Sequence, residues 1–210
     1  LCSFDFKQMK AGINHIPTQE DVAAGYAFIL YAAYVKFHDT KYLEAAMKSL
    51  EALQNQKENR YYEILMPFGA YLAARFNAEQ GKNFDITKFL DWSFDGNPTN
   101  REGWGVIVGK WGDYDVSGLA GSTTHQGGYG FAMNTFDMAW PLFPLVRYDQ
   151  RYARAIGKWA VNAANAARLY CPLDIPDKFQ ALPHKKEITK NVIAYEGLIK
   201  ESNYEIGRAS

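Results

Sequence analysis

Two aspartates separated by one tyrosine, in the segment Asp113-Tyr114-Asp115, have the residue types and spacing that acid–base catalysis uses. In an extended chain the first and third residues point to the same side, with Cα atoms about 6.5–7 Å apart. Neighbouring carboxyl groups push their pKa values apart, so that one serves as an acid and the other as a base. Glycoside hydrolysis needs that division of labour. We therefore predict that Asp113 is the acid or base and that Asp115 is its partner.

Other polar residues offer alternatives for the same chemistry. The carboxylate that works with Asp113 could also be Glu63, Glu102 or Asp137. His125, in the segment STTHQGG, is predicted to relay a proton or to contact the substrate, because imidazole titrates near neutral pH. A structural interpretation stays open, in which the aspartates cap an exposed turn and His125 forms ordinary hydrogen bonds.

The connection from residue 95 to residue 131 carries most of these residues and is rich in glycine and aromatic side chains. Connections longer than about 12–15 residues are usually functional or disordered, and this one is too apolar for disorder. Tyrosine and tryptophan combine a large apolar ring with a polar tip, which suits the faces and hydroxyls of a sugar. The rings predicted to contact a sugar are Trp104, Trp111, Tyr114 and Tyr129. The alternative is that these rings pack over the core.

Composition and motifs exclude several classes of function. The 210 residues have a formal net charge of +0, which gives no electrostatic basis for binding nucleic acid or an acidic membrane surface. No apolar run approaches the roughly 20 residues of a membrane-spanning helix. The segments GVIVGKW and DYDVSG depart from the phosphate-loop and calcium-loop motifs at required positions. We predict neither a metal nor a cofactor. Cys2 and Cys171 could pair or stay free.

The rest of the chain is predicted to be helical, as a single domain over residues 1–210. Helical spacing of apolar residues predicts helices over residues 18–37, 41–56, 61–80, 85–94, 135–149, 150–170 and 187–200. Segments that are apolar almost all round alternate with amphipathic ones, so buried helices are expected to alternate with half-exposed helices. The turn at Asp39 aligns with the turn at Asp149, which indicates a repeated helical hairpin. Pro141 and Pro144 predict a kink, or a helix that starts later.

The alternating hairpins, the HD and YD turns at Asp39 and Asp149, and the aromatic, glycine-rich loop resemble the six-hairpin (α/α) toroid glycosidases and their polysaccharide-lyase relatives. The resemblance covers most of the chain as a pattern. It implies an all-α fold whose helical hairpins form a toroid-like ring, complete or incomplete, with the functional loop 95–131 at one mouth. It also implies a lyase alternative, in which Tyr129 and His125 move protons and Asn134 neutralises a uronate carboxylate. We consider a short strand only at residues 105–108.

The preferred hypothesis is a carbohydrate-active enzyme that hydrolyses an oligosaccharide or polysaccharide with its loop carboxylates. One alternative is a polysaccharide lyase that uses Tyr129 and His125. Another is a non-catalytic helical scaffold that binds glycans. Polysaccharides are usually met outside the cytoplasm, so an extracellular or periplasmic location is expected. The identity of the sugar and the oligomeric state stay open.

Overall fold

The computed structural model describes residues 3–12, 20–61, 63–94, 103–124, 128–171, 177 and 198–199. The helices are α1 (Val22–Phe37), α2 (Thr40–Gln54), α3 (Leu65–Gln80), α4 (Ile86–Phe94), α5 (Ala132–Asp137), α6 (Ala139–Tyr148) and α7 (Ala153–Ala167). Two 3-10 helices, η2 (Gln150–Tyr152) and η3 (Arg168–Tyr170), flank α7. The pairs α1–α2, α3–α4 and α6–α7 are helical hairpins.

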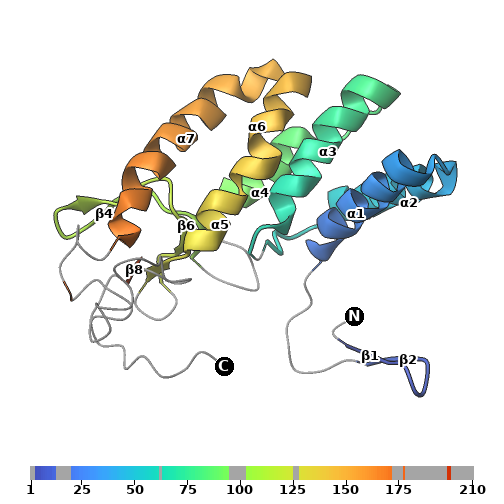
Figure 1. The fold of residues 1–210 in the computed structure, drawn as a ribbon, viewed down its shortest axis with the longest axis horizontal. Coiled ribbons are helices and arrows are strands. Elements are labelled where there is room, and N and C mark those ends of the chain that lie inside the picture. Colours follow the sequence, from blue (N-terminus) through green and yellow to red (C-terminus); the bar gives the residue numbers. More distant parts are fainter. Residues whose placement is uncertain are drawn as a thin grey trace.

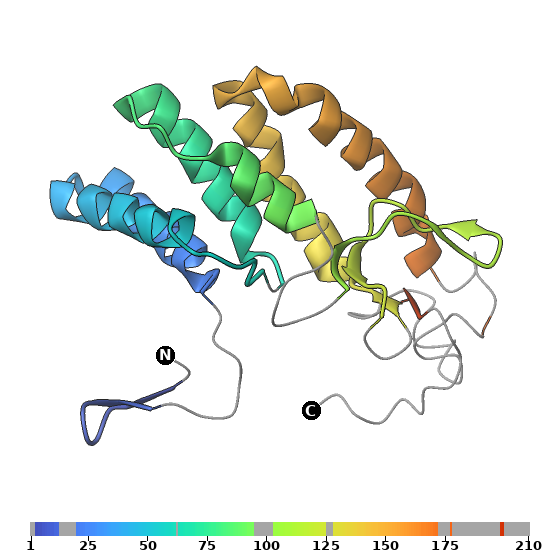
Figure 2. The same cartoon turned by 180° about the vertical axis from the view of Figure 1, so that it is seen from behind.

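The helices lie in two layers (Figure 1). In the inner layer α3 packs between α1 and α6, and each of α2, α4 and α7 packs against its own hairpin partner. Seen from behind, α2 and α4 lie in front of α1 and α3 (Figure 2). The ring of Phe28 is 4.7 Å from that of Phe68, and the ring of Tyr31 is 5.3 Å from that of Phe76. Residue numbers therefore increase in the same direction along α1 and α3, so the two helices are parallel.

An aspartate lies in the turn of every hairpin and caps the helix that follows, which is α2 for Asp39, α4 for Asp85 and η2, just before α7, for Asp149. Asp39 and Asp149 each accept a hydrogen bond from the backbone N–H two residues later, at 3.0 and 3.1 Å. Asp85 accepts one from the N–H three residues later, at 2.9 Å. These bonds satisfy N–H groups that have no partner inside the helix. The predicted equivalence of the turns at Asp39 and Asp149 is therefore confirmed, and Asp85 is a third member of the set.

The connections differ in length between the two ends of the layers. Short turns lie at one end. They are formed by residues 38–39 between α1 and α2, by residues 81–85 between α3 and α4, and by Asp149 between α6 and η2. Residues 55–64 and 95–131 connect successive hairpins at the opposite end, where the C-terminal end of α7 also lies (Figure 1). Binding and catalytic residues are disproportionately found on loops held by a rigid scaffold. A functional site is therefore expected at the end with the long connections.

The prediction of an all-α fold is wrong, because the long loop forms a sheet. Strands β3 (Trp104–Val106), β6 (Ala120–Ser122), β7 (Tyr129–Gly130) and β8 (Leu198–Ile199) pair antiparallel in that order. Two separate hairpins are formed by β1 (Ser3–Asp5) with β2 (Lys10–Gly12), and by β4 (Lys110–Trp111) with β5 (Tyr114–Asp115). None of these strands is long enough to show the alternation of apolar and polar residues by which a strand is predicted.

Two helix predictions need correction. The helix expected over residues 135–149 is two helices, α5 and α6, which meet at Met138. The start of α6 at Ala139 agrees with the alternative of a helix that starts later, and Pro144 lies inside α6. Leu198 and Ile199 form strand β8 rather than the end of a helix over 187–200, and the other residues of that prediction lie outside the described ranges. The C-terminal cap of α3 at Gly81, which has φ of 61°, agrees with the expected glycine cap.

Two apolar cores account for much of the aromatic content. The larger core lies between the helical layers. The smaller one joins the long loop to the end of α7, and its buried residues are Ile107, Trp111, Val116, Leu119, Ala132, Ala166, Leu169, Tyr170 and Leu198. The loop is therefore an ordered part of the fold, fixed against α7.

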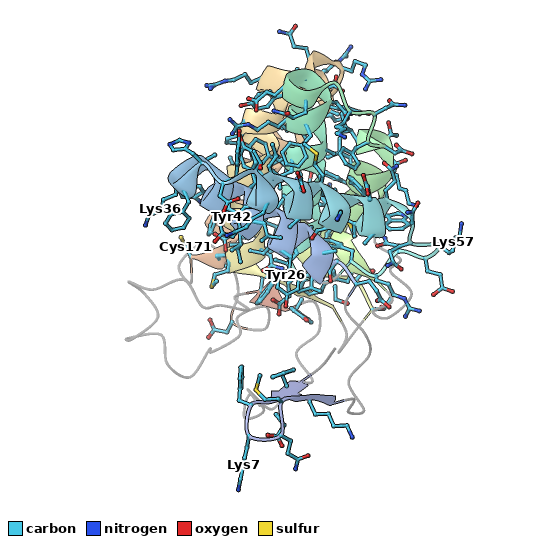
Figure 3. The ribbon with its side chains drawn as sticks, turned by 90° about the vertical axis from the view of Figure 1, so that its right-hand side faces the viewer. Lys7, Tyr26, Lys36, Tyr42, Lys57 and Cys171 are labelled. Carbon is cyan, nitrogen blue, oxygen red and sulfur yellow. The ribbon has the colours of Figure 1, made fainter. Side chains whose placement is uncertain are left out.

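The surface adds three findings. Tyr26 on α1 is 55% exposed and lies on the outside of the molecule (Figure 3). Cys171 is an exposed free thiol just after η3, and Cys2 lies outside the described residues. Among the helices that the structure describes, none has both the length and the apolar content needed to cross a membrane.

Candidate functional site

The segment that contains the two predicted carboxylates is a tight β-hairpin. Lys110 lies opposite Asp115 and Trp111 lies opposite Tyr114, so the hairpin loop is formed by the two residues between them. The first of these loop residues is a glycine with φ of 59°, a backbone conformation that hairpin turns of this length require. The second loop residue is Asp113. The expected extended conformation is therefore wrong for Asp113, which lies in the turn.

Asp115 is held in its ionised form. Its carboxylate accepts a hydrogen bond from the backbone N–H of Ser117 at 2.9 Å. Hydrogen bonds from the Ser117 hydroxyl and N–H, with a smaller contribution from the charge of Lys110, hold the pKa of Asp115 below its usual range. A carboxylate with a lowered pKa is a hydrogen-bond acceptor at neutral pH and does not supply a proton. Of the two roles considered for the pair, acid and base, Asp115 fits only the base or charge-stabilising partner.

The segment that follows the hairpin is fixed directly on α7. The indole Nε1 of Trp159 donates a hydrogen bond to the carbonyl oxygen of Gly118 at 3.0 Å. Gly118 has φ of 95°, and a Cβ at this position would lie 2.5 Å from the backbone nitrogen of Ala163. Only glycine allows both this backbone conformation and this close approach. The hairpin and α7 therefore form two walls in a fixed relation.

A cavity of about 270 Å³ lies between these walls. The hairpin side is lined by Asp113, Tyr114, Asp115 and Ser117, and the α7 side by Asn162, Asn165, Ala166, Arg168 and Leu169. Asn162, Asn165 and Ala166 lie at spacings of three and four on one face of α7. Arg168 and Leu169 belong to η3, which follows α7 directly.

The cavity combines hydrogen-bonding groups of both kinds with a small apolar area. Its two carboxylates only accept hydrogen bonds when ionised, its guanidinium only donates them, and its two carboxamides do both. Ala166 and Leu169 also line the cavity, but each is only 3% exposed, so the apolar surface that they offer is small. A ligand that carries many hydroxyl groups on a compact frame satisfies such a set, because each hydroxyl both donates and accepts.

We compared the chain with protein-family models, with curated proteins and with solved structures. No protein-family model matches this chain. No similar curated protein and no similar solved structure was found either.

The structure brings three of the predicted site residues to the cavity and places others elsewhere. Asp113, Asp115 and Tyr114 line it. Trp104 and Trp111 are 2% and 6% exposed and belong to the two apolar cores. Protein covers their rings, so these rings have no open face on which a sugar could stack. The sequence allowed either contact with a sugar or packing over the core, and the structure shows packing.

Two of the residues proposed for the lyase alternative, Tyr129 and Asn134, do not line the cavity. Tyr129 is 4% exposed and its ring lies 6.1 Å from that of Trp104. Asn134 on α5 is 3% exposed, and its Nδ2 has no hydrogen-bond partner in the described part of the chain. His125 lies outside the described residues, as does Glu102.

Two of the alternative carboxylates, Glu63 and Asp137, are also absent from the cavity lining. Both are half-buried. Glu63 has φ of 61°, which is uncommon for a residue other than glycine. Within the described ranges, no group of three His, Cys, Asp or Glu side chains is arranged to hold a metal ion.

The sequence-based prediction missed Asn162, Asn165 and Arg168. These residues belong to a helix whose polar face was expected to be solvated surface, and nothing in their spacing indicates that a loop covers it. The useful signal was Gly118, because a glycine in an apolar loop often marks a close approach of two backbones.

Proposed function

We propose that this protein binds a carbohydrate in the cavity between the β4–β5 hairpin and α7. The observation that carries the proposal is the lining of the cavity, in which carboxylate, carboxamide, guanidinium, phenol and hydroxyl groups surround the apolar Ala166 and Leu169. Sugars present the same mixture, since their rings have apolar C–H faces and hydroxyls around the edge. The likeness of the helical hairpins to those of the six-hairpin glycosidase-like superfamily, and an extracellular or periplasmic location, belong to this proposal.

The test is a calorimetric titration of the full chain with neutral, amino and uronate oligosaccharides. Asn162→Ala removes a carboxamide from the cavity wall, and Asn55→Ala removes an exposed one from the end of α2 as a matched control. We expect Asn162→Ala to weaken binding about tenfold, which corresponds to ~1.4 kcal/mol for the lost hydrogen bonds. Equal affinity of both variants for the same sugar would contradict the proposed location.

Glycoside hydrolysis is a second candidate function, which one observation favours. Asp113 and Asp115 line the same cavity, and the lowered pKa of Asp115 suits it to the role of the ionised carboxylate in such a pair. In this mechanism Asp115 stabilises positive charge or activates water, and Asp113 donates the proton to the leaving oxygen. Both side chains are exposed in the structure, so a bound sugar would cover them and exclude water from the reacting groups.

Turnover separates hydrolysis from simple binding. Asp113→Asn is expected to abolish the release of reducing ends while sugar binding survives, and Asp91→Asn on the exposed face of α4 serves as the control. Release of reducing ends that persists in Asp113→Asn removes this aspartate from the mechanism. A gain of ultraviolet absorbance with the uronate substrates would instead indicate elimination, the lyase reaction. Binding without any turnover leaves the non-catalytic carbohydrate-binding function.

A further inference from the structure

The size of the cavity limits what it can hold. Its volume of about 270 Å³ lies just below the roughly 300–1,000 Å³ of pockets that take drug-sized ligands. A cavity of about 150 Å³ binds benzene, which is a six-membered ring without substituents. A pyranose is a six-membered ring enlarged by its hydroxyl groups. The cavity therefore has room for one sugar ring, and a second ring would have to lie outside it.

The cavity is also closed at one end. The hairpin wall reaches Ser117, and the next residue, Gly118, packs directly on the backbone of Ala163 in the α7 wall. The hydrogen bond from Trp159 to Gly118 holds this junction together. A sugar in the middle of a chain needs room for neighbours on both sides, and the junction blocks one of them.

From these two observations we propose that the cavity accepts the terminal sugar unit of a glycan, so that the protein recognises chain ends. This inference rests on the proposed carbohydrate binding and adds the form of the ligand. The terminal unit enters from the hairpin tip, where Asp113 lies, and the remainder of the glycan extends into solvent. Asn162 and Asn165, three residues apart on α7, contact the hydroxyls of that unit from one side, and Asp115 and Ser117 contact it from the other.

The experiment compares three ligands made of the same sugar, whose identity comes from the oligosaccharide panel. They are the monosaccharide, linear oligomers of two to five units, and a cyclic oligosaccharide that has no ends. Chain-end recognition predicts that the monosaccharide and all linear oligomers bind within about threefold of one another, and that the cyclic compound does not compete. An affinity that rises about tenfold with each added unit, or equal binding of the cyclic compound, would overturn the inference.

A pair of variants tests the same point without changing the ligand. Asn165→Trp places a large ring at the rim of the cavity, and Ala164→Trp places the same ring on an exposed position of α7 that does not line it. We expect the first variant to lose binding of the monosaccharide and the second to retain it. Retention by both would contradict the inference. If none of the sugars binds the unmodified protein, the proposed function itself fails, and the inference falls with it.

Discussion

The indole of Trp159 donates a hydrogen bond to the carbonyl oxygen of Gly118 at 3.0 Å, across 41 positions of sequence. This contact joins a helix to the segment after the β4–β5 hairpin and so fixes the width of the cavity between them. One wall of the cavity is formed by a loop. The position of this wall relative to α7 therefore depends on the hydrogen bond between Trp159 and Gly118.

Replacing Trp159 by phenylalanine removes the donor and leaves the Gly118 carbonyl without this partner. Loss of a buried hydrogen bond lowers the free energy of unfolding by about 1 kcal/mol. The smaller phenylalanine ring lowers it further, because it makes fewer packing contacts. We expect a lower urea midpoint and weaker sugar binding for Trp159→Phe. Trp140→Phe, at an indole that is 76% exposed, is the control and should change neither. Unchanged sugar affinity in a destabilised Trp159→Phe protein would show that the attachment does not shape the cavity.

The lowered pKa of Asp115 makes a prediction about acid stability. A carboxyl whose pKa is lower in the folded than in the unfolded state stabilises the fold above the unfolded value, about 3.9. This contribution is lost as the pH falls through the folded pKa. The asparagine of the Asp115→Asn variant cannot titrate. The free energy of unfolding of the wild type should therefore exceed that of the variant at pH 7, and this excess should be smaller at pH 3. Urea denaturation at both values measures the difference, and a gap that widens in acid would contradict the hydrogen bonding described for Asp115.

Asn134 has a buried amide nitrogen for which the described residues offer no hydrogen-bond partner. Its buried Nδ2 donates no hydrogen bond within the described structure, and an unsatisfied buried donor costs roughly 1–3 kcal/mol. Leucine has nearly the same shape and no polar atoms. We expect Asn134→Leu to raise the free energy of unfolding by about 1 kcal/mol and to leave sugar binding unchanged, because Asn134 does not line the cavity. A loss of binding would return Asn134 to the ligand contacts predicted from the sequence.

Arg75 links all three helices of the inner layer. Its guanidinium carbon lies 4.6 Å from the ring centre of Tyr31 on α1 and 5.4 Å from that of Tyr148 on α6, and its Nη1 donates to the hydroxyl of Tyr71 at 2.9 Å. Lysine keeps the charge but not the planar group. We expect Arg75→Lys to lower stability by about 1–2 kcal/mol in urea denaturation. A change no larger than that of Arg154→Lys, at an exposed position on α7, would contradict this linking role.

The helical hairpins could be predicted from the sequence because their signals are local. Apolar residues at helical spacing and the capping aspartates Asp39 and Asp149 act within one or two turns of chain. The strands could not be predicted, because segments of two or three residues pair only through contacts made elsewhere in the fold. Tyr129 joins the strand at Ala120–Ser122, and Leu198 joins Tyr129–Gly130 from a segment expected to be helical.

One wall of the candidate site could be predicted from the sequence and the other could not, because only the first has a local signal. Asp113 and Asp115 are conspicuous in the sequence because they are close together, and both line the cavity. The opposite wall contains Asn162 and Asn165, whose spacing is that of any exposed helix face. Their role arises only when Gly118 packs on α7, which is a contact between distant parts of the chain. The hydrogen bonds that lower the pKa of Asp115 come from the hairpin geometry, which the extended interpretation of the segment had not included.

The most direct test of carbohydrate binding in this cavity is an NMR titration that follows the side-chain amide signals of the asparagines. Asn162 and Asn165 line the cavity, whereas Asn134 is buried away from it, so the same spectrum contains the test and its control. We predict that a saturating sugar shifts the side-chain signals of Asn162 and Asn165 and leaves that of Asn134 in place. Shifts confined to Asn134, or no shift at Asn162 and Asn165 with sugar bound, would contradict the site.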